Sequence, residues 1–257
     1  MPHNPTVRIL PDADTAVLLI HGICGSPTQF RRLLPLEQMI PENWSVYNMV
    51  LDGHCKTVED FSRSSMKKWK AQVQYVFDEL SLSHRKVILV GHSMGTLLSI
   101  DLAIRNPEKV GYLFLVGVPV RVGVRPFGIT NLFRVAFDRL DTSEPVQTSM
   151  GIATGMTLTK KLWKYIPWTP RIVELLHFGY AIGQQAPLLS VSAVAWQSRK
   201  DEMVSNRSAA VLRRCGKINV HEMAQSTHFY YAPGDKDRIL ESFSDMIQCL
   251  QNNTAVR

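Results

Sequence analysis

The sequence lacks any apolar run long enough to cross a membrane. Its longest uncharged apolar stretch, Val110–Val120, has 11 residues, whereas a helix that spans a bilayer needs about 20. Residues 1–10 contain neither a basic segment nor the apolar stretch of a secretory signal. Cysteine is also scarce, and no CxxC spacing occurs among Cys24, Cys55, Cys215 and Cys249. These absences predict a cytoplasmic protein with reduced thiols.

Motifs that bind phosphates, metals or nucleic acids are missing as well. Neither GxGxxG nor GxxxxGK[ST], the glycine-rich loops that hold phosphate groups, is present. His54-Cys55 and three scattered cysteines do not form a metal-ligand cluster. The net charge is +7, but no basic helix or nucleic-acid motif accompanies it. We therefore expect no cofactor, no metal and no nucleic-acid partner, and we interpret the charge as a solvated basic surface.

Short aliphatic runs alternate with amphipathic segments along most of the chain. Strands are expected at residues 16–20, 45–51, 86–90, 110–118, 188–196 and 217–221, and helices at 66–80, 94–106 and 239–250. Ser26-Pro27-Thr28-Gln29 matches a capping box, which predicts a further helix through Leu34. This alternation is typical of a parallel sheet covered by helices on both faces.

Between residues 119 and 187 the alternation stops. No strand pattern occurs there, and prolines separate helical patterns such as Phe127–Leu140. We predict a helical cap at 119–187, inserted into a core made of residues 1–118 and 188–257. Large apolar side chains are expected to form mostly the cap's own core and to leave an apolar cavity beneath it: Phe127, Phe133, Phe137, Met150, Met156, Trp163, Trp168 and Phe178.

Gly91-His92-Ser93-Met94-Gly95 matches the G-x-S-x-G nucleophile elbow. A predicted strand precedes this pentapeptide and a predicted helix follows it, which is the context that the motif requires. Glycines on either side of the serine allow the strand and helix to cross without Cβ clashes. Ser93 is therefore the predicted nucleophile.

A serine hydroxyl needs a histidine to accept its proton. If the catalytic residues follow one another along the chain in the order serine, acid, histidine, the histidine must come after Ser93 with room for an acid between them. His177, His221 and His228 meet this condition. His177 falls in the predicted cap and His221 at the end of a strand pattern, where packing explains an imidazole better. His228 lies between the last strand pattern and the last helix, so we predict that it is the base.

The acid is expected after the strand pattern at 188–196. Asp201 occupies that position, with Glu202 as its neighbour and rival. Asp235 follows His228 in the chain, which violates the order, and it fits better as the N-cap of the final helix. We predict Asp201 as the residue that orients His228.

The developing oxyanion needs two backbone N–H donors. Met94, directly after the nucleophile, is expected to supply one, and Ile23, in the turn after the first strand pattern, the other. His21 is expected to hold that turn as a structural residue. His54 is interpreted as a residue that orders its loop, with substrate contact as the alternative.

Together these motifs resemble the α/β-hydrolase superfamily, and within it the bacterial carboxylesterase and monoacylglycerol lipase group. The resemblance implies a mostly parallel sheet flanked by helices, an inserted helical cap, and hydrolysis of carboxylic esters without metal or cofactor. Cys24, Cys55 and Thr96 depart from the residues usual in that group. Acyltransfer, thioester hydrolysis, peptide hydrolysis and a catalytically silent binding protein remain alternatives.

The expected partner is a small-molecule ester with an apolar acyl group, of short to medium chain length or like a monoacylglycerol. Residues 120–175 carry eight Lys or Arg against four acids. A basic exterior on an apolar cap would suit weak contact with an anionic membrane surface, although a solvated face explains the same residues. The sequence makes no prediction about oligomeric state.

Overall fold

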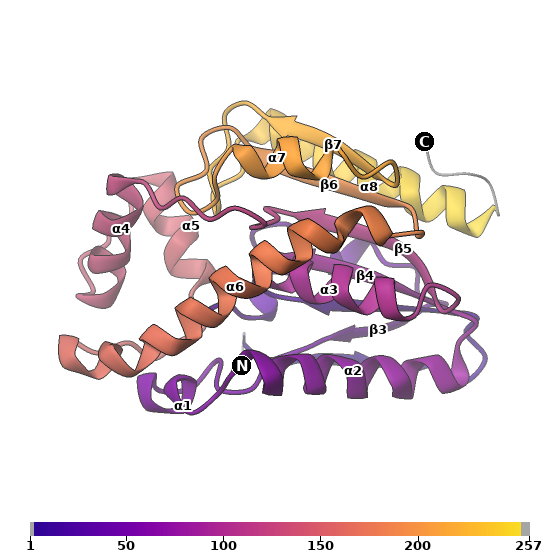
Figure 1. The fold of residues 1–257 in the computed structure, drawn as a ribbon, viewed down its shortest axis with the longest axis horizontal. Coiled ribbons are helices and arrows are strands. Elements are labelled where there is room, and N and C mark those ends of the chain that lie inside the picture. Colours follow the sequence, from indigo (N-terminus) through magenta and orange to yellow (C-terminus); the bar gives the residue numbers. More distant parts are fainter. Residues whose placement is uncertain (1–2, 253–257) are drawn as a thin grey trace.

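A seven-stranded sheet forms the centre of the computed structural model, which describes residues 3–252 apart from the side chains of residues 129 and 132 (Figure 1). The strand order is β1-β3-β2-β4-β5-β6-β7, and every neighbouring pair is parallel except β1 with β3. The strands are β1 (Thr6–Arg8), β2 (Thr15–Ile20), β3 (Ser45–Asn48), β4 (Lys86–His92), β5 (Val110–Val116), β6 (Ala193–Ser198) and β7 (Ile218–Met223). The predicted fold class, a mostly parallel sheet flanked by helices, is confirmed.

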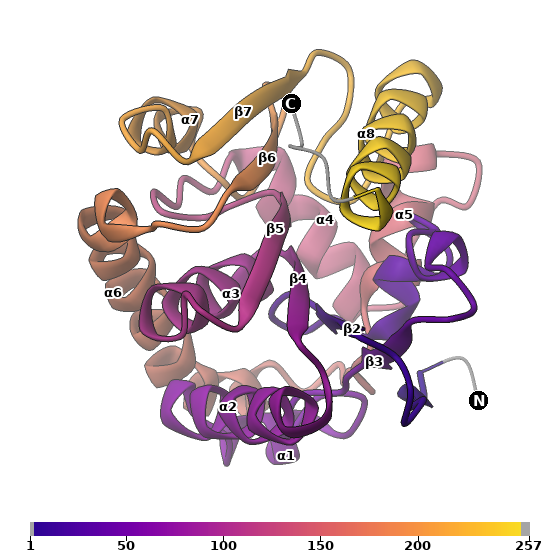
Figure 2. The ribbon, with the colours of Figure 1, turned by 90° about the vertical axis from the view of Figure 1, so that its right-hand side faces the viewer.

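Helices cover both faces of this sheet (Figure 2). They are α1 (Val58–Ser62), α2 (Met66–Ser83), α3 (Met94–Arg105), α4 (Pro126–Ala136), α5 (Pro145–Ala153), α6 (Thr169–Gln185), α7 (Arg207–Leu212) and α8 (Pro233–Gln251), with short 3₁₀ helices η1 (Pro27–Phe30), η2 (Glu37–Met39), η3 (Leu162–Trp168) and η4 (Ala186–Leu188). Alternate residues of each strand point to opposite faces. Leu18 and Leu89 therefore pack with α2 and α3, whereas Val17 and Ile88 pack with α8.

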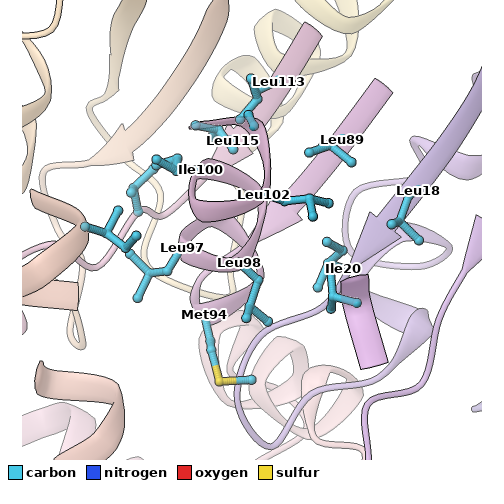
Figure 3. Close-up of a cluster of buried hydrophobic side chains, with 14 of the residues drawn as sticks. Leu18, Ile20, Leu89, Met94, Leu97, Leu98, Ile100, Leu102, Leu113 and Leu115 are labelled. Carbon is cyan, nitrogen blue, oxygen red and sulfur yellow. The ribbon is translucent and has the colours of Figure 1, made fainter. Parts of the chain in front are cut away.

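Helix α3 is buried nearly all round. Met94, Leu97, Leu98 and Ile100 pack among strand residues such as Leu115 (Figure 3). Each fully buried aliphatic side chain stabilises the fold by about 1.5–3 kcal/mol. This packing fixes the amino end of α3, and hence the turn that precedes it, relative to the ends of β2, β4 and β5.

Several boundaries differ from the sequence predictions. The capping-box helix is only the 3₁₀ turn η1, because the Gln29 side chain bonds to the Gly22 N–H instead of the cap residue. The strand predicted from 188 begins at Ala193, since residues 186–188 form η4. Elements β1, α1 and α7 were not predicted, because runs of three to six residues give too little periodicity.

Between β5 and β6 the structure describes helices and no strand. The insertion is tied to the rest of the chain by bonds from Trp168 Nε1 to the Val58 carbonyl and from the Met66 N–H to Glu174. Farther along α6, Gly179 lies so close to Pro119 that an added Cβ would be 2.5 Å from its carbonyl oxygen. The second half of α6 therefore packs against the segment that follows β5 and against Leu97 of α3.

The apolar residues of the insertion do not all form a core. Met150 and Met156 are buried, but Phe127, Phe133 and Trp163 are 42%, 50% and 64% exposed. The expectation of an internal core is wrong for these three, because α4 and η3 each pack through one face only. None of the helices within residues 3–252 is long and apolar enough to cross a bilayer.

Candidate active site

Ser93 occupies a strained turn between β4 and α3. Its backbone has φ 51° and ψ −121°, a conformation that costs a non-glycine residue of order 1–3 kcal/mol. The flanking glycines make the turn feasible: a Cβ on Gly95 would lie 1.9 Å from the Ile20 carbonyl oxygen, and one on Gly91 would lie 2.7 Å from the Thr96 Cα. The pentapeptide therefore adopts the sharp turn that the elbow requires.

His228 and Asp201 form a buried pair. His228 Nδ1 donates to Asp201 Oδ2 at 2.8 Å, and both side chains are 2% exposed. The other carboxylate oxygen, Oδ1, accepts the N–H groups of Met203 and Val204 at 2.8 and 2.7 Å. Because the Nδ1 proton is held by Asp201, neutral His228 presents Nε2 as its acceptor.

The end of β5 brings this pair beside Ser93. The Ser93 N–H donates to the Val116 carbonyl at 2.9 Å. The next residue, Gly117, has φ +68°, and a Cβ added to it would lie 3.1 Å from His228 Cε1. The imidazole and the serine thus meet at one strand end. No hydrogen bond joins Ser93 Oγ to the His228 ring among the described atoms.

Nearby carboxylates raise the pKa of His228, although burial alone would lower it. Burial lowers the pKa of its imidazole, but the charge and hydrogen bond of Asp201 and the charge of Glu202 outweigh it, so the pKa is raised above 6.5. His92, whose ring centroid is 5.0 Å away, behaves differently. Burial, followed by the repulsion of His228, lowers the pKa of His92 to about 3, so His92 stays neutral.

The turn after β2 lies against Ser93. A Cβ on Gly22 would be 2.9 Å from the Ser93 Cβ, and Gly25 closes the turn by donating to the Gly22 carbonyl at 3.0 Å. The Ile23 N–H has no hydrogen-bond acceptor in the described part of the protein. Met94 is the first residue of α3, so its N–H has no intrahelical partner. Two backbone donors are thereby available near the serine.

His21 ties this turn to the neighbouring loop. Its Nε2 accepts the Leu51 N–H at 3.1 Å, so its Nδ1 carries the proton and donates to the Gly22 carbonyl at 2.8 Å. Burial, reinforced by His54, lowers the pKa of His21 to about 3. His54 packs edge-on against His21 and Phe61, and its Nδ1 donates to the Asp52 carbonyl. Both rings order loops in this arrangement.

Three further residues position the site, and sequence reasoning missed these roles. Gln29 Oε1 accepts the Gly22 N–H at 2.9 Å. His92 Nε2 lies 3.2 Å from the His228 carbonyl oxygen, to which it donates. Glu202 Oε2 accepts the His228 backbone N–H at 2.8 Å, so this rival acid contacts the main chain of His228 while Asp201 contacts the ring. The partners in these contacts are 7 to 136 residues apart in the sequence, so no local sequence pattern predicts them.

Asp235 does not cap the final helix as predicted. Ala232 is the N-cap of α8, and Asp235 Oδ2 instead accepts the N–H groups of Gln225 and Ser226 and the Ser226 hydroxyl. Because Pro233 starts the helix, Asp235 sits in its first turn and faces the loop that carries His228. Its carboxylate thus fixes that loop.

The other residues singled out from the sequence have different surroundings. His177 is exposed on α6, and His221 stacks on Trp196 at 4.7 Å. Cys24 and Cys55 have φ 55° and 59°, and burial raises the pKa of their thiols to about 12 and about 11. The described residues contain no group of three or more His, Cys, Asp or Glu arranged to hold a metal ion.

Known proteins with similar sequences include enzymes of more than one kind. The chain is 31% identical over 108 residues to a thermostable monoacylglycerol lipase of Bacillus sp. (strain H-257), covering 42% of this chain and 40% of that protein. It is 33% identical over 107 residues to a Bacillus subtilis (strain 168) protein provisionally named 2-succinyl-6-hydroxy-2,4-cyclohexadiene-1-carboxylate synthase, covering 41% and 37%. The alignments thus span about two fifths of these relatives.

Solved structures and a family profile agree on the fold. A structure from work on LipS and LipT, two metagenome-derived lipolytic enzymes, superposes with a TM-score of 0.72 at 21% identity, covering 96% of this chain and 98% of that one. Carboxylesterase CesB (YbfK) from Bacillus subtilis superposes with a TM-score of 0.59 at 13% identity, covering 98% and 88%. The profile of the α/β hydrolase family matches residues 17–239. The chain therefore belongs to the α/β hydrolase family.

Proposed function

We propose that the protein is a serine hydrolase that cleaves carboxylic esters through an acyl-Ser93 intermediate. The observation that carries this proposal is the buried hydrogen bond between His228 Nδ1 and Asp201, formed beside the strained turn that holds Ser93. A buried carboxylate that fixes one tautomer of a histidine next to a serine elbow is the arrangement needed to activate a hydroxyl.

In the first step, His228 Nε2 takes the Ser93 proton while Oγ bonds to the ester carbonyl carbon. The carbonyl π electrons move to oxygen, and Asp201 stabilises the imidazolium that forms. The C–O bond then breaks, and His228 returns the proton to the departing alcohol. Water repeats the sequence on the acyl-enzyme and releases the acid.

The oxyanion that forms in each step would be stabilised by the N–H groups of Ile23 and Met94. Preorganised donors of this kind are worth about 2.7–4 kcal/mol each, because they need no rearrangement when charge develops. Gln29 and His21 support this role by holding the Gly22 peptide from both sides. The turn is therefore fixed before the substrate arrives.

We propose residues 119–187 as a cap that favours apolar acyl groups. Met156 and Leu175 of this segment belong to the buried cluster that also contains Met94 and Leu97 of α3. The Gly155 N–H donates to the Cys24 carbonyl at 2.9 Å, next to the turn that contains Ile23. Apolar side chains of the insertion thus lie close to the serine turn, which suits an acyl chain.

A series of p-nitrophenyl esters of increasing acyl length tests this function. Each added CH₂ that enters an apolar pocket contributes about 0.8 kcal/mol, or roughly a fourfold rise in kcat/KM. We expect kcat/KM to rise to a maximum at a short to medium chain and then to fall once the pocket is full. The measurement is initial-rate kinetics with each ester.

Two controls distinguish this proposal from its alternatives. A flat profile across the series would show that the cap does not select the acyl chain. Adding a thiol or alcohol acceptor tests for transfer: if product partitions to the acceptor more than to water, the protein is an acyltransferase. Labelling by a fluorophosphonate without turnover of any ester would indicate a peptidase or a thioesterase, whereas absence of both labelling and turnover would indicate a silent binder.

We also propose contact with anionic membrane surfaces from within the cytoplasm. The exposed apolar residues Leu162, Trp163 and Ile166 follow directly on exposed Lys160 and Lys161, and each cation near such a surface contributes about 1 kcal/mol. Cosedimentation should be stronger with phosphatidylglycerol vesicles than with phosphatidylcholine vesicles, and Trp163→Ala should weaken it. Equal binding to both vesicle types would contradict this proposal. The structure describes no disulfide at Cys24, Cys55 or Cys215, which suits a reducing compartment.

A further inference from the structure

Glu202 is a fully buried carboxylate that no step above uses. Its Oε2 accepts the His228 N–H at 2.8 Å, whereas its Oε1 is buried without a hydrogen-bond partner among the described residues. Burying a carboxylate with one unsatisfied oxygen costs free energy. A glutamine would accept the same N–H at less cost. The charge of Glu202 therefore needs an explanation beyond a single hydrogen bond.

The surroundings of Glu202 fix its carboxylate near His228. Its backbone carbonyl accepts the Arg125 N–H at 2.8 Å, and Gly128 of α4 packs so closely that an added Cβ would lie 3.1 Å from the Glu202 Cβ. The Arg125 side chain bonds instead to the Arg199 carbonyl. Among the described residues no Lys or Arg forms an ion pair with Glu202, and the group bonded to it that can become positive is His228.

The other titratable groups in this cluster do not compete for a proton at neutral pH. His92, at the end of β4, is kept neutral by burial and by His228. The pKa of Tyr231, on the loop of His228, is raised by burial and by Asp201 and Glu202, so its phenol stays neutral. Two carboxylates therefore lie next to His228: Asp201 bonds to its ring and Glu202 to its main-chain N–H.

We propose that Glu202 is a positioning residue that holds the His228 main chain and acts as a second carboxylate stabilising protonated His228. This inference rests on the proposed ester hydrolysis, in which the Ser93 proton passes to His228 Nε2 as Oγ bonds to the carbonyl carbon. Asp201 binds the ring at Nδ1, and Glu202 acts on it through space from the backbone side. The positive charge is shared between two anions in a buried site, where charges interact more strongly than in water.

Burial raises the pKa of the Glu202 carboxyl. The charge of His228 and the hydrogen bond from the His228 N–H lower the same pKa. The proposal requires the carboxylate to be ionised where the protein is active. It follows that removing this charge without removing the hydrogen bond should make His228 easier to deprotonate. Glu202→Gln makes that change, because the amide oxygen can still accept the His228 N–H.

The experiment measures the rate of fluorophosphonate labelling of Ser93 against pH. In the wild-type protein the rate should fall on acidification, because protonated His228 cannot act as base, with a midpoint above 6.5 since the pKa of His228 is raised. In Glu202→Gln the midpoint should move to lower pH by on the order of one unit. The plateau rate should fall about tenfold, because the developing imidazolium has lost one of its two anions.

Glu222→Gln is the matched control. Glu222 lies on β7 and pairs with Arg199 and Arg213 on the surface, so this variant loses one negative charge without touching His228. Its midpoint should equal that of the wild-type protein. A folded Glu202→Gln variant with an unshifted midpoint would overturn the role of the charge. Absence of labelling at Ser93 in the wild-type protein would instead overturn the proposed hydrolase function.

A measurement on the unaltered protein covers the case in which Glu202→Gln does not fold. Carbon-13 NMR of the glutamate side-chain carboxyls reports whether Glu202 is ionised at the pH of full labelling. We expect the Glu202 carboxyl carbon to have the chemical shift of an ionised carboxylate. Its signal is assigned as the glutamate signal that disappears in the Glu202→Asp variant. A protonated Glu202 at that pH would refute the proposal, since a neutral acid cannot stabilise an imidazolium by its charge.

Discussion

Replacing Ser93 with alanine is expected to lower kcat by on the order of 10⁶-fold, by analogy with serine proteases that lose their nucleophile. The alanine side chain carries no oxygen to form the acyl-enzyme. Alanine should fit the turn, because its Cβ takes the position that the Ser93 Cβ already occupies. Steady-state kinetics with the best ester of the series would measure the loss.

The matched control is Ser99→Ala. Ser99 lies on α3, six residues after Ser93, and is buried. Within the described residues its hydroxyl donates to the Gly95 carbonyl at 2.9 Å and has no other partner. This variant should retain activity and fluorophosphonate labelling, and intact-mass analysis should find the adduct on the Ser93 peptide. Full activity in Ser93→Ala, or an adduct on another residue, would mean that the nucleophile is misassigned.

Asp201→Asn is expected to lower kcat by about 10⁴-fold. Asparagine can still accept the Met203 and Val204 N–H groups through its amide oxygen, so the loop should persist. The amide N–H₂ then faces His228 Nδ1, which favours the tautomer whose proton sits on Nε2. That tautomer cannot accept the serine proton, and the imidazolium loses its carboxylate.

Asp237→Asn provides the comparison, because Asp237 is exposed on α8 and forms no hydrogen bond with His228 or Asp201 among the described residues. Its kcat should match that of the unaltered protein. Circular dichroism before kinetics would show that both variants are folded. If Asp201→Asn retains most of its activity while Glu202→Gln loses it, Glu202 and not Asp201 is the acid of the triad.

The local patterns predicted the parts of the fold that periodicity encodes. Strands β2, β4 and β5 and helices α2, α3 and α8 have the buried, alternating or amphipathic patterns expected of them. The serine turn was predictable because its glycines, serine, strand and helix are contiguous. The pairing of His228 with Asp201 was predictable only through chain order, which follows from the order of strands in the sheet.

Other features depend on contacts that no local pattern encodes. Gln29 looked like part of a capping box, yet its amide holds the Gly22 peptide. Asp235 was predicted as a cap, but the helix begins two residues earlier at Pro233, and its carboxylate accepts the Ser226 N–H instead. The exposure of Phe133 and Trp163 was also unpredictable, since helix periodicity shows which residues share a face and not whether a neighbour covers it.

The bond from Gly155 to the Cys24 carbonyl has a mechanical consequence. Two more bonds, from the Thr28 hydroxyl to the Ile152 carbonyl and from the Thr157 N–H to the Lys56 carbonyl, tie the same stretch of the insertion to the loops beside Ser93. A rigid swing of the whole insertion would pull on the turn that contains Ile23 and misalign its N–H. A movement of the insertion that leaves this turn in place is therefore confined to its other segments, because residues 152–157 are held by these three bonds.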